Sequence, residues 1–273
     1  MKITLKTMVS NASEVPFLWM MFHEAASLVD RIVVTEFNQT HSGLNREFLF
    51  HEYVDDFLSV FPNLIYLQGK DIPGVIRNAD SSEGHHHNET LMRGWFASQL
   101  KFRNWEYVVS TDADEVLYES TYKWVHDNLS WRDKGVRFRL HQFFYRPNFL
   151  WEGKEFIAPV ALRFGHYGQK YPENWRYQGK KLPGYWGAHF SWCIPAEEMA
   201  RKLKNYSHAH EQKHLSNVDL MRQARQQRLY PFEPEEDLRL SAIPYSSPLL
   251  PDGFRKYRHL LSAEVLGQEG VDW

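Results

Sequence analysis

The sequence predicts one α/β domain spanning residues 1–273, with a mixed sheet of Rossmann type flanked by helices. Strand-like apolar runs alternate with helical patterns through residues 1–115, and such alternation is typical of a parallel sheet. The fourth strand-like run, Tyr107–Val109, is followed closely by the acids Asp112, Asp114 and Glu115. Ligands bind at the carboxyl ends of strands in such sheets. The same pattern therefore predicts the fold and the place of its site.

The elements expected in the first half are short and well separated. Strands are expected at 2–9, 31–36, 64–68 and 107–109, and helices at 13–28, 45–61 and 89–102. Ser13, Asn45 and Asn88 are polar residues of the kind that begin helices. Residues 69–84 contain Gly, Pro and Ser and predict a loop that continues into His85–His87. Adjacent histidines diverge, so a metal site there is a minor alternative.

The second half has no repeat, no low-complexity linker and no clear domain boundary. Helices are expected at 120–129, 195–204 and 217–229, and strands at 136–145, 158–164 and 185–193. Ser216–Asp219 resembles a capping box before the last of these helices. The segment from Pro231 is rich in proline and is expected to be irregular until 254–261. The apolar content of 43% supports one sizeable core for all these elements.

Charge and cysteine content exclude several classes of protein. A net charge of −2 carries no global signature of nucleic-acid binding. The single cysteine, Cys193, excludes a disulfide scaffold within the chain and favours a reducing compartment. No window reaches the roughly 20 apolar residues that a membrane span needs, and the first residues do not resemble a signal peptide. We therefore expect a soluble, cytoplasmic protein with no membrane span.

The acids after the fourth strand suit divalent-metal chemistry. Residues two apart along an extended chain point the same way, so Asp112 and Asp114 can converge on one point. Two hard oxygen ligands on a short loop suit Mn²⁺ or Mg²⁺ that also holds phosphates. Asp-x-Asp is the arrangement of metal-dependent nucleotide-sugar transferases, although the same spacing also occurs in solvated turns and at helix N-termini.

A series of short blocks gives this motif a context. They are Glu36–Gly43, the pair Glu89 and Arg93, Val109–Glu115, Gly187–Cys193, Lys202–Glu211 and, weakly, Phe254–Tyr257. In this order they resemble glycosyltransferase family 17, the family of the β-1,4-mannosyl-glycoprotein N-acetylglucosaminyltransferase. The chain departs from the family pattern at His41 and Ser42, and by an extra histidine between His208 and Glu211.

The resemblance implies a GT-A type fold and an inverting, metal-dependent glycosyltransferase. Residues 1–115 would form the nucleotide-sugar-binding half, and 116–273 the acceptor-binding half and C-terminal tail. The donor would be a UDP-sugar, with N-acetylglucosamine as the family-based choice of sugar, and the acceptor a glycan or polysaccharide. Such a reaction needs a metal clamp because the leaving nucleoside diphosphate develops negative charge.

The resemblance also assigns roles to residues. Asp112 and Asp114 would bind Mn²⁺ or Mg²⁺, with His210 or His208 as a third ligand. Glu115 and Glu211 are the candidates for the catalytic base that deprotonates the acceptor hydroxyl, and their order stays open. The expected donor-binding residues are Asn11, Glu36, Asn38, Glu89, Arg93, Asp112 and His189.

Each assignment has a structural alternative. Arg93 could instead pair with Glu89 one helical turn away, and Glu36 and Asn38 could form a turn. His208 and His210 could be hydrogen-bonded core or turn residues. One or two of the aromatic residues Trp151, Trp175, Tyr177, Tyr185 and Trp192 are expected to stack on sugar or base, with the others in the core.

Other functions remain open at this point. One alternative is a phage-type glycosyltransferase acting on a modified DNA base, which the balanced charge disfavours. Another is an inactive sugar- or nucleotide-binding module, which the intact acids Asp112, Asp114 and Glu115 disfavour. A nuclease or nucleotidyltransferase would need a third acid in a matching strand, and none is recognisable.

Overall fold

The computed structural model describes residues 1–152, 155–167, 178–190, 192–205, 215–230 and 239–267. In this part of the chain the largest sheet has seven strands in the order β10-β6-β9-β4-β1-β2-β3. Four parallel strands form one side of it: β1 (Ile3–Val9), β2 (Arg31–Phe37), β3 (Leu64–Gly69) and β4 (Tyr107–Ser110). β9 (Val160–Arg163) runs antiparallel to β4 and extends the sheet toward β6 (Gly135–Arg137) and β10 (Lys180–Lys181).

Two small sheets accompany the main one. The first joins β5 (Glu115–Leu117), β11 (Gly187–His189) and β7 (His141–Gln142), and the second joins β12 (Leu240–Ala242) to β8 (Phe149–Trp151). β5 begins at the last acid of the Asp-x-Asp-Glu motif. The motif therefore spans the passage from the main sheet to the first small sheet.

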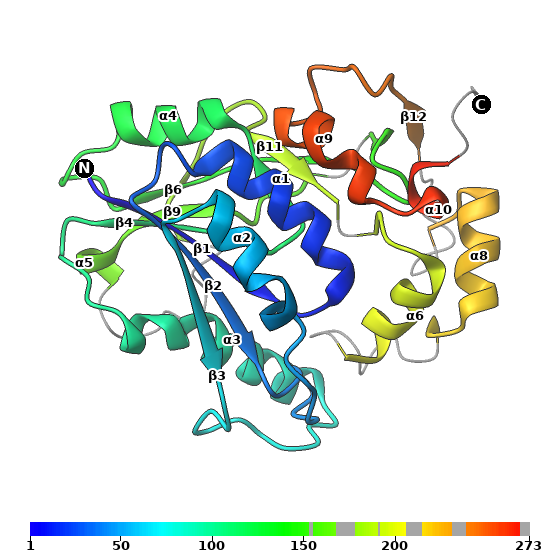
Figure 1. The fold of residues 1–273 in the computed structure, drawn as a ribbon, viewed down its shortest axis with the longest axis horizontal. Coiled ribbons are helices and arrows are strands. Elements are labelled where there is room, and N and C mark those ends of the chain that lie inside the picture. Colours follow the sequence, from blue (N-terminus) through cyan, green and yellow to red (C-terminus); the bar gives the residue numbers. More distant parts are fainter. Residues whose placement is uncertain (153–154, 168–177, 191, 206–214, 231–238, 268–273) are drawn as a thin grey trace.

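Helices cover both faces of the parallel strands (Figure 1). The main ones are α1 (Val15–Ala25), α2 (Val54–Val60), α3 (Ser82–Gln99), α4 (Glu119–Asn128), α6 (Ala196–Asn205), α8 (Val218–Gln227) and α9 (Asp252–Tyr257). Short helical turns are η1 (Ala12–Glu14), η2 (Phe50–Tyr53), α5 (Phe164–Tyr167), η5 (Arg258–Leu260) and α10 (Ala263–Leu266).

The alternation of side chains along the strands explains the layers. Ile32 and Val34 belong to the large core that includes Phe22 of α1, whereas Val33 belongs to a second cluster with Phe96 of α3. Successive residues of a strand point to opposite faces, so the apolar run of β2 packs against helices on both sides. Figure 1 shows α1 and α2 in front of these strands and α3 behind them. The predicted Rossmann-like α/β class is confirmed, and it is consistent with a GT-A fold.

Helix α3 begins earlier than the sequence predicted. Ser81 accepts a hydrogen bond from the Gly84 N–H and caps the helix, so His85–His87 lie inside it rather than in a loop. Asn88 is fully buried in this helix and not a cap. Its side chain receives the Ile76 N–H at 2.7 Å and donates to the His41 carbonyl at 2.9 Å. Asn88 thus fastens two loops to α3.

The helix predicted to begin at Asn45 begins instead at Phe50. The Glu36 carboxylate accepts the backbone N–H groups of Leu49 and Phe50, at 2.6 and 3.0 Å. Residues 46–49 form no regular element, and local helix signals could not reveal these bonds to Glu36. The strands expected at 136–145 and 185–193 are likewise shorter, as Gly135–Arg137, His141–Gln142 and Gly187–His189.

Candidate active site

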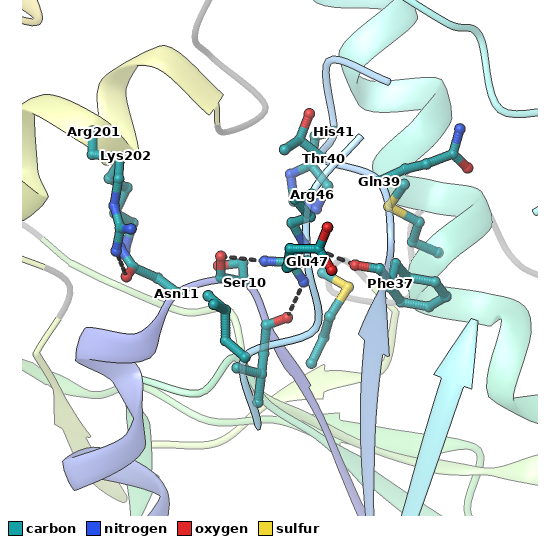
Figure 2. A pocket seen from close by; sticks show the side chains of 14 residues that line it. Ser10, Asn11, Phe37, Gln39, Thr40, His41, Arg46, Glu47, Arg201 and Lys202 are labelled. Atoms are coloured by element: carbon teal, nitrogen blue, oxygen red, sulfur yellow. Dashed lines mark hydrogen bonds between the residues drawn. The ribbon is translucent and has the colours of Figure 1, made fainter. Parts of the chain in front are cut away.

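The candidate site lies where the strand order reverses. The chain passes from β1 to β2 on one side and later returns to β4 on the other side of β1. Such a reversal opens a crevice at the carboxyl ends of the strands, where ligands bind in open α/β sheets. A pocket of about 280 Å³ lies at the ends of β1 and β2. It is lined by residues of these ends and of α6, including Asn11, His41, Arg46, Arg201 and Lys202 (Figure 2).

A larger cavity of about 840 Å³ lies on the other side of the turn that follows β1. Its lining is mostly apolar and includes Val15, Trp19 and Leu261. The acid motif is joined instead to the smaller pocket, because Lys202 lines that pocket and contacts Asp114. We therefore take the smaller pocket as the candidate site.

Asp112 is held by a cation from helix α3. The Arg93 guanidinium donates to both carboxylate oxygens of Asp112, at 3.0 Å to Oδ2 and through a shorter contact to Oδ1. Arg93 also donates to Glu89, four residues before it, at 2.6 and 2.8 Å. Burial alone would lower the pKa of Arg93, but Asp112 and Glu89 raise this pKa well above its usual value. The pair with Glu89 therefore occurs, and Arg93 also binds a carboxylate of the motif, which the sequence did not indicate.

Asp114 is buried and paired with a cation from helix α6. Lys202 Nζ donates to Asp114 Oδ2 at 3.0 Å, and His189 Nε2 lies 3.9 Å from Oδ1. Burial would raise the pKa of Asp114, but Lys202 and His189 lower it below its usual value. Burial would also lower the pKa of Lys202, whereas Asp114 and Glu14 raise it. Both partners are therefore charged at neutral pH.

Glu115 lies behind the two aspartates. It is fully buried, and its carboxylate accepts the Asp112 N–H at 2.8 Å. In the small sheet, Glu115 of β5 is the register partner of His189 of β11. The His189 ring stacks on Phe156 with centroids 3.8 Å apart. The structure thus brings Glu115, His189 and both aspartates into one cluster.

The turn after β1 links the pocket to α6. Asn11 caps η1, and its side-chain oxygen accepts hydrogen bonds from the Ser13 N–H and from Arg201. Glu14 completes a capping box by accepting the Ser10 and Asn11 N–H groups. Burial raises the pKa of Glu14 despite these bonds and the nearby Lys202. The helix expected to begin at Ser13 is therefore capped two residues earlier, by Asn11.

Arg46 was not among the predicted site residues, yet it organises the strand ends. Its guanidinium donates to the carbonyl oxygens of Val9, Ser10 and Phe37. It also lies 3.9 Å from Glu36, which is fully buried and accepts the Tyr66 hydroxyl at 2.6 Å. Asn38 accepts the Asp71 N–H at 3.0 Å. One arginine in a polar loop offers no local signal for such a role.

Several predicted residues lie elsewhere. His208, His210, Glu211, Trp175 and Tyr177 are outside the described residues. Of the other aromatic candidates, Trp192 lies with its ring 5.6 Å from Lys202 Nζ, while Trp151 is buried against Phe144 and Tyr230. Tyr185 is 46% exposed and stacks on His141. Trp192 is therefore the aromatic candidate that the described part of the chain places beside the acids.

The histidine run does not form a metal centre. His85 contacts the Ala79 carbonyl, His86 lies 3.5 Å from Glu89, and His87 contacts the Gly74 carbonyl. The three rings diverge, as adjacent residues on a helix must. Among the residues that the structure describes, no group of three or more His, Cys, Asp or Glu side chains could hold a metal.

The chain has a Rossmann-like α/β fold that is consistent with the GT-A type, and its acid motif is joined to a pocket at the strand ends. A search of curated proteins finds no match to the chain. The family model of glycosyltransferase family 17 matches residues 4–230. The chain belongs to glycosyltransferase family 17, and this membership makes it a sugar-transferring enzyme that uses a donor and an acceptor. In the described segments, no helix has the length and apolar character needed to cross a membrane.

Proposed function

We propose that this protein transfers N-acetylglucosamine, with inversion, from a UDP-sugar to a glycan or polysaccharide acceptor. The observation that carries the proposal is the Asp112–Asp114 pair at the switch point of a family 17 chain, joined through Lys202 to the adjacent pocket. Paired carboxylates at this place suit a nucleotide donor whose phosphates need a counter-charge. The single buried cysteine, Cys193, supports a cytoplasmic location as part of the same proposal.

The donor set fits Mn²⁺ or Mg²⁺. A carboxylate has about four lone pairs, and the two bonds from Arg93 use two of those of Asp112. The low pKa of Asp114 keeps its carboxylate charged. These cations bind through one or two carboxylates and complete their coordination with water and substrate phosphates. Asp112 and Asp114 would hold the metal, with His210 as a proposed third ligand, and the metal would stabilise the charge of the leaving diphosphate.

Arg93 and Glu115 would position the acid pair. Arg93 sets the plane of the Asp112 carboxylate by bonding both oxygens, and Glu115 anchors the Asp112 N–H. A catalytic base must come within hydrogen-bond distance of the acceptor hydroxyl. The complete burial of Glu115 supports Glu211 as the base and Glu115 as a positioning residue.

The end of β1 and the loop after β2 would receive the nucleoside. Arg46 and Glu36 fix this end of the pocket by bonding backbone groups, so they would act as supports for Asn11, Asn38 and His41 rather than as ligands of the donor. Glu89 would act through Arg93, and His189 through Asp114. Under these assignments, each predicted donor-binding residue either lines the site or supports a residue that does.

A screen of nucleotide sugars for metal-dependent hydrolysis and transfer tests the proposal. UDP-N-acetylglucosamine with Mn²⁺ or Mg²⁺ should be consumed faster than GDP-, CDP- or other UDP-sugars, and EDTA should stop the reaction. Asp112→Asn serves as the matched inactive control, and glycans and polysaccharides serve as acceptors. Full activity in EDTA would refute the metal requirement. Preferential use of another nucleotide would refute the UDP assignment.

A further inference from the structure

Lys202 occupies an unusual position between the acid motif and the donor pocket. It projects from α6, lines the pocket together with Arg201, and places Nζ 3.0 Å from Asp114 Oδ2. Its side chain is 17% exposed, and that of Asp114 is 8% exposed. Figure 2 shows Arg201 and Lys202 reaching down from α6 on the opposite side of the pocket from Gln39 and His41. A buried carboxylate and a solvent-facing pocket therefore share one ammonium group.

Lys202 reaches Asp114 through a long side chain that can rotate. The hydrogen bond to Asp114 joins two side chains, and the Trp192 ring lies 5.6 Å from Nζ. A lysine ammonium is a compact charge on a flexible stem of four carbons, so it can change partners by rotating about its own bonds. A divalent cation at Asp114 would repel the ammonium, because both are positively charged. The two cations would also compete for the same carboxylate oxygens.

We propose that Lys202 is a resident counter-ion of Asp114 that is displaced by the donor's divalent cation and then binds the donor diphosphate. The inference rests on the proposed transferase function and deepens it, by assigning a residue of α6 to the phosphate part of the donor. Asp114 keeps a cationic partner in both states, so the buried charge is never left uncompensated. Lys202 would thereby contact the diphosphate only when nucleotide and metal are both present.

Binding of Mn²⁺ alone and of UDP alone or with Mn²⁺ tests this exchange without any assay of transfer. The variants are Lys202→Gln, which removes the charge, and Lys202→Arg, which keeps it. Lys204→Gln, an exposed change on the same helix, is the matched control. Calorimetry measures the affinity for UDP. The electron spin-resonance signal of free Mn²⁺ measures the affinity for the metal.

Lys202→Gln should bind Mn²⁺ about tenfold more tightly and, at saturating Mn²⁺, UDP about tenfold more weakly, the scale of one charge-assisted hydrogen bond. Lys202→Arg should bind Mn²⁺ more weakly than the wild type, because a guanidinium can hold a carboxylate through two hydrogen bonds. This second variant retains the charge that the fold needs, so it tests the competition even where Lys202→Gln fails to fold. Lys204→Gln should match the wild type.

Unchanged or weakened Mn²⁺ binding in Lys202→Gln would overturn the counter-ion role, as would wild-type Mn²⁺ affinity in Lys202→Arg. Unchanged UDP affinity in Lys202→Gln would overturn the diphosphate role. Wild-type protein that binds neither Mn²⁺ nor UDP would overturn the transferase proposal as well. Normal wild-type binding without a response to Lys202 changes would overturn this inference alone.

Discussion

The two ends of the candidate site hold their charged side chains in different ways. At the ends of β1 and β2, Arg46 donates to three backbone carbonyls, and Glu36 accepts two backbone N–H groups. At the end of β4, Arg93 and Lys202 donate to the side chains of Asp112 and Asp114. Bonds to backbone groups are part of the fold, whereas bonds between side chains can be replaced by a ligand. We therefore call the first end the scaffold end, and we propose the second as the reactive end.

The sharpest test of this difference is removal of the reactive acids. Asp112→Asn and Asp114→Asn should each lower transfer about 10³-fold, because the charge that holds the metal and the leaving group is lost. The melting temperature should change little for Asp112→Asn, since Asp112 is the more exposed of the two. Asp127→Asn, at an exposed position on α4, provides the control. Transfer within about threefold of wild type, judged against the fold-changes typical of catalytic groups, would show that the acids are not catalytic.

The second test separates the base from its neighbours. Glu211→Gln should lower transfer by about 10²-fold with little change in UDP affinity, because general-base catalysis acts on the acceptor hydroxyl. Glu115→Gln should have a smaller effect, since an amide oxygen can still accept the Asp112 N–H. Product assays and calorimetry on both variants measure the split. If both variants transfer at near wild-type rates, neither glutamate is the base.

At the scaffold end the expected loss is in stability. Arg46→Met leaves three carbonyls without their donor and should lower the free energy of unfolding by about 3 kcal/mol. Denaturant unfolding measures this loss, with Arg222→Met on the exposed face of α8 as the control. A stable Arg46→Met protein that has lost only donor affinity would contradict the distinction between the two ends.

The smallest effect concerns pH. Burial lowers the pKa of His41 from 6.5 to about 4, so the folded protein binds this proton less readily than the unfolded chain. The contribution of neutral His41 to the folding stability is therefore complete above pH 6.5. It is lost as the pH falls toward about 4, because the unfolded chain binds a proton there that the folded protein does not. His41 is only partly buried as a whole residue, so we expect a loss of about 1–2 kcal/mol. Unfolding curves of wild type and His41→Gln should diverge over this range, and parallel curves would contradict the shift.

At the scaffold end, the sequence predicts the strands but not the side-chain bonds that hold their ends. The strands β1 to β4 follow from short apolar runs, and Tyr107–Val109 leads directly into the acids. The start of α3 was mispredicted because Asn88 resembles a cap but bonds to distant loops. The backbone bonds of Arg46 and Glu36 could not be predicted, since they depend on how separate strands and loops meet.

At the reactive end, the sequence motif identified the acids but not their partners. Arg93 is expected from the sequence to bind the donor or to pair with Glu89, and its bonds to Asp112 join residues 19 apart. Lys202 and Asp114 are 88 residues apart and come from different elements. No local pattern links such residues, so these pairs emerge only from the folded chain. The division into donor and acceptor halves at residue 115 stays a prediction. The candidate pocket is lined by residues from both sides of this division, because it includes residues of α6.

The most direct test of the account is a crystal structure of the protein with UDP and Mg²⁺. We predict that the metal is coordinated by Asp112 or Asp114 and that Lys202 Nζ has left Asp114 for a phosphate oxygen. Arg46 should still donate to the carbonyls of Val9, Ser10 and Phe37. A nucleotide bound away from the β1 and β4 ends, or Lys202 still on Asp114 without a phosphate contact, would contradict the account.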